Sequence, residues 1–267
     1  MDWDEMARPW LEAAPDLEAS FSEVFKALFG AAQLKLGETV LDVGCGTGPT
    51  LAYASKAVGS EGRVVGIDVA PPLVAVAAKR ALGNVELITG HAGSHAYETG
   101  TFDAIVANFG IMFFDDNTAA FENLRSAMKP NGRMAATFWA TPPENPWFSM
   151  PRRIVDSLVE DVPRPDPSGP GPMRFGDPAS LQALVEKTGW KSEIRTLDLM
   201  LRPPGSAERV ADLHMKVTVG MMLKGVEISE HKLGEIRMAV ADACKQYQSE
   251  QGIAVPARIH LLEAVAV

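Results

Sequence analysis

A glycine-rich segment that follows a short apolar run has the residue types of a ligand-binding turn. Val40, Leu41 and Val43 form the apolar run, and the chain continues from position 44 as Gly-Cys-Gly-Thr-Gly-Pro. A strand that ends in glycines and opens into a helix presents backbone N–H groups to a ligand. Glycine is needed there because a Cβ atom would block the ligand's close approach or force strain at positive φ. The segment is therefore a candidate small-molecule site.

Two acidic residues restrict which ligand this turn would hold. Asp42 lies inside the turn, where a carboxylate repels a pyrophosphate and suits a ligand with ammonium or sulfonium charge. Asp68 ends the next apolar run, where its carboxylate can accept both hydroxyls of a ribose. Pro49 stands where the G-x-G-x-x-G dinucleotide fingerprint has its third glycine, which disfavours a nicotinamide-dependent oxidoreductase.

The elements around these residues alternate between strands and helices. Residues 1–36 have apolar residues near helical spacing, with Pro9 and Pro15 as interruptions. After the first strand we expect helices over 50–58, 71–82 and 118–128, and strands over 63–68, 85–88, 102–108 and 132–140. The segment KPNG at 129–132 reads as a turn. This alternation predicts a doubly wound α/β fold with a parallel sheet, whose functional crevice lies at the carboxyl ends of the strands.

The pattern loosens beyond residue 140. Segments 141–151 and 162–172 are rich in proline, so we expect neither continuous helix nor central strand there. A helix over 178–188, a sixth strand over 190–201, a largely helical stretch over 206–250 and a closing strand over 256–267 complete the prediction.

Four segments of the chain read VLDVGCGTG at 40–48, VVGIDVAPPLV at 64–74, FDAIVANFGIMFF at 102–114 and LRSAMKPNGRMAATFW at 124–139. Together they resemble motifs of the class I S-adenosylmethionine-dependent methyltransferases, most closely the branch of ubiquinone/menaquinone-biosynthesis-type small-molecule methyltransferases. The resemblance implies a Rossmann-like, mostly parallel sheet of seven strands with the last antiparallel, helical cap insertions, and S-adenosylmethionine as cofactor. It divides the chain into an N-terminal helical lid (1–36), the cofactor-binding core (37–140), a cap insertion (141–176), a core continuation (177–205), a helical cap insertion (206–255) and the closing strand (256–267).

The resemblance also assigns roles to residues of the site. Gly44, Gly46 and Gly48 would form the floor under the methionine part of the cofactor, with Cys45 as a small residue that fits the turn. Asp42 would hold the amino group directly or through water, Asp68 would bind the ribose, Val69 would lie beside the adenine, and Asn108 and Phe109 would line the methionine end. The family's usual acid after the third strand is replaced by His91, so we expect adenine recognition to rest on the backbone of Ala92 and a neutral imidazole nitrogen.

Composition restricts the partners. The formal net charge is −9, and binding to nucleic acid or to an anionic membrane surface usually requires a basic patch. Both are therefore disfavoured as partners. The N-terminus lacks the order of a signal peptide, and two cysteines are too few for a disulfide framework, so we expect a cytoplasmic protein. Met221 and Met222 fit an adaptable acceptor pocket, ordinary core packing or a homodimer contact, and these alternatives stay open.

The leading functional hypothesis is an in-line transfer of the methyl group to a small-molecule acceptor, and the alternative is a non-catalytic protein that binds or senses S-adenosylmethionine. Candidates for a general base are His91, His95 and His214, none of them unambiguous, and no metal site is expected. Trp3 and Trp10 suit either a lid or ordinary helix packing. An apolar or aromatic acceptor is suggested by side chains of the two cap segments, namely Trp147, Phe148, Phe175, Met215 and Met222.

Overall fold

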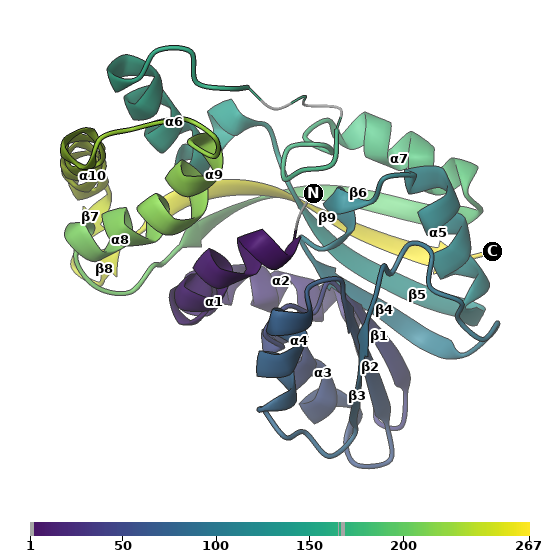
Figure 1. Ribbon diagram of the computed structural model, residues 1–267. Coiled ribbons are helices and arrows are strands. Elements are labelled where there is room, and N and C mark those ends of the chain that lie inside the picture. The colour runs from purple at the N-terminus through teal and green to yellow at the C-terminus, as the bar shows by residue number, and fades with distance from the viewer. Residues whose placement is uncertain (1–2, 165, 167–168) are drawn as a thin grey trace.

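The computed structural model describes residues 3–164, 166 and 169–267. Within these residues, seven strands form one twisted sheet (Figure 1). In chain order they are β1 (Thr39–Val43), β2 (Arg63–Asp68), β3 (Val85–Thr89), β4 (Phe102–Asn108), β5 (Met128–Trp139), β6 (Trp190–Leu201) and β9 (Val255–Ala266). Their spatial order is β3-β2-β1-β4-β5-β9-β6. Only β9 runs antiparallel to its neighbours β5 and β6, which confirms the mostly parallel sheet with its last strand reversed.

Helices cover both faces of the sheet. They are α2 (Ser22–Ala32), α3 (Pro49–Val58), α4 (Pro71–Ala78), α5 (Asn117–Ser126) and α7 (Pro178–Lys187), while the first helix, α1 (Trp3–Ser20), lies beside α4. A hydrophobic core lies on each face of the sheet. In strand β4, Ala104 and Val106 pack with α2 and α3 on one face, whereas Ile105 and Ala107 belong to the larger cluster on the other. Burial on both faces explains why this strand is an unbroken apolar run.

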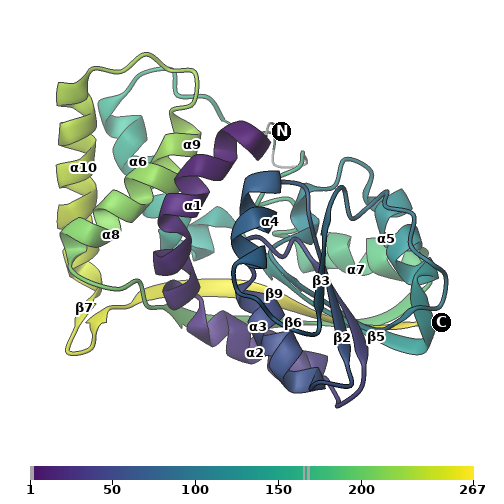
Figure 2. The same cartoon turned by 60° about the horizontal axis from the view of Figure 1, so that its bottom comes forward.

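A second group of helices stands over one end of the sheet. It consists of α6 (Pro146–Leu158), α8 (Ala207–His214), a π-helical turn (Met215–Val219), α9 (Gly220–Met222) and α10 (Glu230–Cys244). A short hairpin, β7 (Gln248–Ser249) with β8 (Gly252–Ile253), joins α10 to β9. In Figure 2 helix α1 runs between this group and α4, and it packs against α4 and the π-helical turn.

Three sequence expectations about proline are wrong. Helix α1 continues through Pro9 and Pro15, and α6 forms inside a segment that was expected to be irregular, with Pro146 in its first turn and Pro151 in its interior. Each interior proline costs roughly 3 kcal/mol of helix stability. Burial of apolar side chains such as Leu17 in α1 and Val155 in α6 offsets this cost, at roughly 1.5–3 kcal/mol for each large side chain.

The ends of several other elements also differ from expectation. The second helix of the core ends at Ala78 rather than 82, because Ala81 turns the chain at a φ of 50°. The segment KPNG lies within β5, where Asn131 has a φ of 60° and the ladder to β4 shifts register. The stretch 206–250 contains strand β7 after its helices.

Candidate functional site

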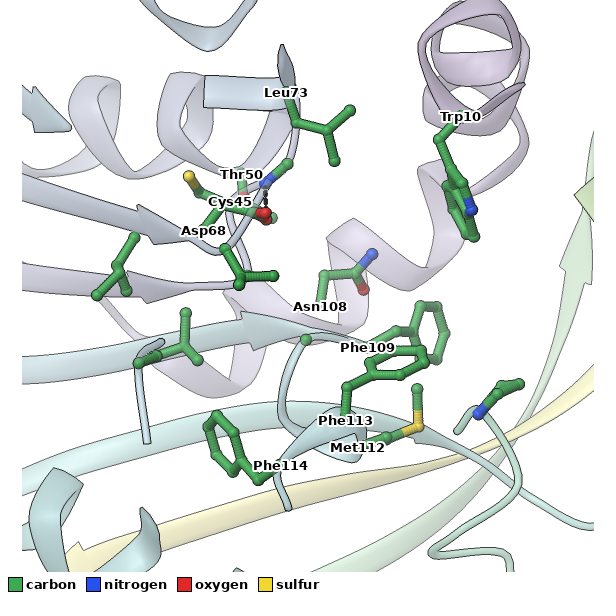
Figure 3. Close-up of a pocket in the computed structure, with 18 of the residues that line it drawn as sticks. Trp10, Cys45, Thr50, Asp68, Leu73, Asn108, Phe109, Met112, Phe113 and Phe114 are labelled. Carbon is green, nitrogen blue, oxygen red and sulfur yellow. Dashed lines mark hydrogen bonds between the residues drawn. The ribbon is translucent and has the colours of Figure 1, made fainter. Parts of the chain in front are cut away.

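A cavity of about 580 Å³ opens at the carboxyl ends of β1, β2 and β4. Figure 3 shows its two ends: Cys45, Thr50 and Asp68 lie together at one, and Trp10, Phe109, Phe113 and Met112 gather at the other. Asn108 lies between them. A single space therefore connects the glycine turn to the end of the cavity lined by aromatic side chains, which we call the aromatic chamber.

The glycine turn contributes Gly44, Cys45, Gly46 and Thr47 to the wall of this cavity. A Cβ atom at Gly46 would meet no atom within 4 Å and would stand in open space, at a φ of +53°. A Cβ at Gly44 would lie 2.7 Å from Cα of Gly110, so this glycine lets the ends of β1 and β4 approach each other. Gly48 was expected beside the ligand but is not part of the wall. It precedes α3, and a Cβ there would lie 3.1 Å from side-chain atoms of Arg80 and Leu51.

Asp68 lies at the end of β2 and lines the cavity, where it was expected. Its Oδ2 accepts a hydrogen bond of 2.8 Å from the backbone N–H of Gly46, and its Oδ1 accepts one of 2.9 Å from Ala70. Burial raises the pKa of this carboxyl, while those backbone donors oppose the shift. The side chain therefore holds the glycine turn in place and presents its remaining lone pairs to the cavity.

Asp42 is fully buried and does not line the cavity, which corrects the expectation of a direct ligand contact. Its Oδ2 accepts a hydrogen bond of 2.5 Å from the hydroxyl of Thr50, and Thr50 does line the cavity. Its Oδ1 has no hydrogen-bond partner. Burial raises the pKa of Asp42 to about 7, and the nearby Asp68 adds to the shift. Any influence of this carboxyl on a ligand passes through Thr50 or a bridging water.

The shifted pKa of Asp42 predicts a pH-dependent stability. Between its ordinary pKa of 3.8 and about 7 the carboxyl is protonated in the folded chain and ionised in the unfolded chain. The stability contributed by the protonated form is complete below 3.8 and is lost as pH rises through about 7. We expect the free energy of unfolding, measured with urea across this range, to fall with rising pH in the parent. In Asp42→Asn the part of this fall that comes from Asp42 should be absent. Equal slopes for the two proteins would contradict the buried, protonated carboxyl.

The loop after β3 forms the neighbouring wall. Residues 90–94, which include His91 and Ala92, line the cavity together with Val69. Asn123 of α5 holds this loop, because its Nδ2 reaches the carbonyl oxygens of Gly93 at 3.3 Å and of His95 at 2.9 Å. The expected grouping of Asp68, Val69, His91 and Ala92 at one end of the site is therefore present.

Asn108 is the last residue of β4, Phe109 follows it, and both line the cavity, as expected. The Asn108 Oδ1 accepts a hydrogen bond of 2.8 Å from the hydroxyl of Thr137. Phe109 adopts a φ of 58°, which is rare for a bulky residue and costs on the order of 1–3 kcal/mol. Its ring stacks on Trp139 at 4.2 Å between centroids, with 5° between the planes. Strained backbone held by such packing is typical of functional sites.

Four rings form a connected wall of the chamber, which we call the aromatic cluster: Phe21, Phe109, Trp139 and Phe148. Trp10 and Trp147 also line the cavity, and the side chain of Trp3 lies outside the described residues. Of the cap residues singled out from the sequence, Trp147 and Phe148 belong to the wall. Phe175 packs on Phe138 instead, and Met215 and Met222 are not wall residues, although Val217 and Met221 of the same helical segment are.

Two of the three histidine candidates for a base lie away from the cavity. The ring of His95 packs against Tyr97 at 4.8 Å. His214 is fully buried behind the wall residue Trp147, at 4.3 Å between ring centroids, and burial lowers its pKa to about 3. Only His91 of the three lines the cavity. Burial also raises the pKa of the Cys45 thiol, which keeps it protonated and fits its expected role as a small residue of the turn.

Several wall residues were not identified from the sequence as parts of the site. Thr50 is the second residue of α3, Leu17 and Glu18 lie on α1, and Phe21 lies at the junction of α1 and α2. The sequence of α1 places Glu18 among apolar residues, and this pattern is only a weak indication that the helix lines a binding site. Leu17, Glu18 and Phe21 reach the cavity because α1 crosses the carboxyl edge of the sheet (Figure 2). A glycine turn after β1 and a carboxylate at the end of β2 form the arrangement that is typical of nucleoside-binding α/β proteins.

Comparison with known proteins identifies the family. A family model described as a methyltransferase domain matches residues 40–132. Nocamycin O-methyltransferase of Saccharothrix syringae is 34% identical over 200 residues, covering 70% of this chain and 71% of that protein. A demethylmenaquinone methyltransferase of Oceanobacillus iheyensis is 33% identical over 105 residues, covering 38% of this chain and 44% of that protein. The crystal structure of a SAM-dependent methyltransferase from Aquifex aeolicus matches with a TM-score of 0.52 and 26% identity, covering 75% of this chain and 93% of that one.

The chain therefore belongs to the class I S-adenosylmethionine-dependent methyltransferases, in the small-molecule branch that includes the quinone-biosynthesis type. It is an enzyme that uses S-adenosylmethionine to methylate a small-molecule acceptor. The comparisons thus support the leading hypothesis over that of a non-catalytic binding protein. Across the described ranges, no helix combines the length and apolar character needed to cross a bilayer.

Proposed function

We propose that this enzyme methylates an apolar or aromatic small molecule inside the aromatic chamber. The observation that carries the proposal is the continuity of one cavity from the glycine turn to the aromatic cluster. Its volume of about 580 Å³ lies within the range of about 300–1,000 Å³ that is usual for ligand pockets. The open space over Gly46 and the carboxylate of Asp68 beside it suit the nucleoside end of the cofactor.

The charge of the wall supports a cationic cofactor. Among the described residues the wall carries the carboxylates of Glu18, Asp68, Asp115 and Asp116, but no lysine or arginine side chain. A bound sulfonium with its ammonium group is attracted by such a wall, whereas a pyrophosphate is repelled. We assign the ribose to Asp68, the adenine to the space between Val69 and Ala92, and the methionine end to the turn 44–46 with Asn108.

Positioning can supply much of the rate. S-adenosylmethionine supplies a methyl group that is already activated by its sulfonium sulfur. The turn at Gly46 and the side chain of Asn108 orient that end of the cofactor, and the aromatic cluster holds the acceptor opposite it. Trp10 from α1 and Trp147 from α6 enclose the chamber and exclude water from an in-line displacement. His91 is the remaining histidine candidate should the acceptor need to lose a proton.

A truncation in the aromatic cluster separates acceptor binding from cofactor binding. We expect calorimetric titration of the S-adenosylhomocysteine-loaded enzyme to detect 1-naphthol binding and no ethanolamine binding. Phe148→Ala should weaken naphthol binding about tenfold, because part of the burial of a large aromatic ring is lost. Affinity for S-adenosylhomocysteine should stay at the parental value.

Met238→Ala is the matched control, because Met238 is an apolar residue of α10 that is 64% exposed and lies outside the cavity wall. It should change neither affinity. Preference for ethanolamine over naphthol, or equal naphthol affinity in parent and Phe148→Ala, would reject the aromatic acceptor while leaving cofactor binding intact.

A further inference from the structure

Arg80, in the turn that follows α4, joins two separate parts of the cavity wall. Its Nε donates a hydrogen bond of 2.7 Å to the carbonyl oxygen of Thr47 in the glycine turn. Its Nη2 donates one of 2.7 Å to Oε2 of Glu18 on α1. Thr47 and Glu18 both line the cavity, whereas Arg80 is not a wall residue. One guanidinium thus connects the glycine turn to the helix that crosses over it.

Helix α1 is tied to its surroundings by ion pairs on two sides. Toward the cap, Asp16 pairs with Arg209 of α8 at 2.8 Å. Toward the core, Glu18 pairs with Arg80. The same helix contributes Trp10 and other apolar side chains to the cavity wall. The position of α1 therefore affects how far the cavity is enclosed, and Arg80 holds the helix on the side next to the glycine turn.

The geometry requires an arginine rather than another cation. The planar guanidinium engages the carboxylate and the carbonyl at once through separate N–H groups, whereas the ammonium of lysine lacks this rigid fork. The side chains of Arg80 and Glu18 are only 28% and 38% exposed, so the pair is better shielded than a typical surface ion pair. The stem of Arg80 packs over the turn, since its Cδ would lie 3.1 Å from a Cβ at Gly48.

We propose that Arg80 is a positioning residue that couples the seating of α1 over the cavity to the conformation of the glycine turn. While Glu18 is engaged, both walls hold the shape that encloses the cofactor. The cofactor then leaves only after this connection breaks, so the connection governs its dissociation rate more than its association rate. The proposal rests on cofactor binding in this cavity, which the Gly46→Val substitution described below tests separately.

Stopped-flow fluorescence with S-adenosylhomocysteine tests this coupling through a double-mutant cycle. We expect Arg80→Met to raise the dissociation rate about tenfold and Glu18→Gln about threefold, with the association rate nearly unchanged. The double variant should match Arg80→Met, because Glu18 acts through Arg80. Arg63→Met, which removes an exposed ion pair with Glu86 at β2 and β3, should leave both rates unchanged.

A merely structural role would instead lower the melting temperature without changing the ratio of the two rates. Strictly additive effects of the two substitutions, or a parental dissociation rate in folded Arg80→Met, would overturn the proposal. If Arg80→Met fails to fold, Arg80→Lys still decides, since lysine keeps the positive charge outside the wall but lacks the fork that holds Glu18 and Thr47 at once. Salt gives a second readout: rising ionic strength should speed dissociation in the parent and not in Glu18→Gln.

Discussion

Gly46→Val should abolish binding of both S-adenosylmethionine and S-adenosylhomocysteine. A Cβ at this position points into open cavity, so the branched side chain of valine would occupy space that the cofactor needs. The φ of +53° adds backbone strain for any residue with a Cβ. Calorimetric titration of the folded variant should detect no heat of binding at concentrations that saturate the parent.

Gly37→Val controls for strain alone. Gly37 also has a positive φ, of +80°, and a Cβ there would also meet no atom within 4 Å, but the residue is exposed and outside the cavity wall. This variant should lose some stability and keep full cofactor affinity. Cofactor binding by Gly46→Val at the parental affinity would mean that the cofactor lies elsewhere.

Asp68→Ala should weaken binding of S-adenosylhomocysteine about 100-fold while the chain remains folded. The substitution removes the carboxylate that we assign to the ribose hydroxyls, and hydrogen bonds to a charged group contribute roughly 1.5–3 kcal/mol each. It also leaves the N–H groups of Gly46 and Ala70 without their acceptor, so the glycine turn loses a support. Calorimetry gives the affinity, and circular dichroism with thermal melting confirms that the chain is folded.

Asp103→Ala is the matched control for this loss. Asp103 also accepts a hydrogen bond from a backbone N–H, that of Thr39 at 2.8 Å, and it pairs with Lys129, but it lies outside the cavity wall. Its removal should lower the melting temperature and leave cofactor affinity unchanged. Equal affinities for Asp68→Ala and the parent would show that the ribose role is wrong.

Much of the fold follows from apolar periodicity. Strands β2, β4 and β6 have the predicted bounds, 63–68, 102–108 and 190–201, and glycine or proline lies close to the ends of all three. The helical character of residues 1–36 was predicted, but the continuity of α1 through Pro9 and Pro15 and the helix that contains Pro151 could not be, because a local rule about proline is overridden by burial that depends on the rest of the molecule.

The part of the site that comes from adjacent strand ends was also predictable. Asp68, Val69, Asn108 and Phe109 line one cavity because the carboxyl ends of parallel strands meet at the same edge. Residues that reach the cavity through tertiary packing carry no such signal. Glu18 depends on the path of α1, and His214 is excluded because Trp147 lies between it and the cavity, a fact of packing that residue type alone does not reveal.

We propose that this enzyme transfers a methyl group from S-adenosylmethionine to an aromatic or apolar small molecule held in the chamber. The most direct test incubates the enzyme with methyl-labelled S-adenosylmethionine and a panel of small hydroxylated aromatic, aliphatic and amine acceptors, and identifies labelled products by mass. We expect label in one or more aromatic products, with the rate reduced in Phe148→Ala and lost in Gly46→Val. Label found only in polar amine products, or transfer that persists in Gly46→Val, would contradict it.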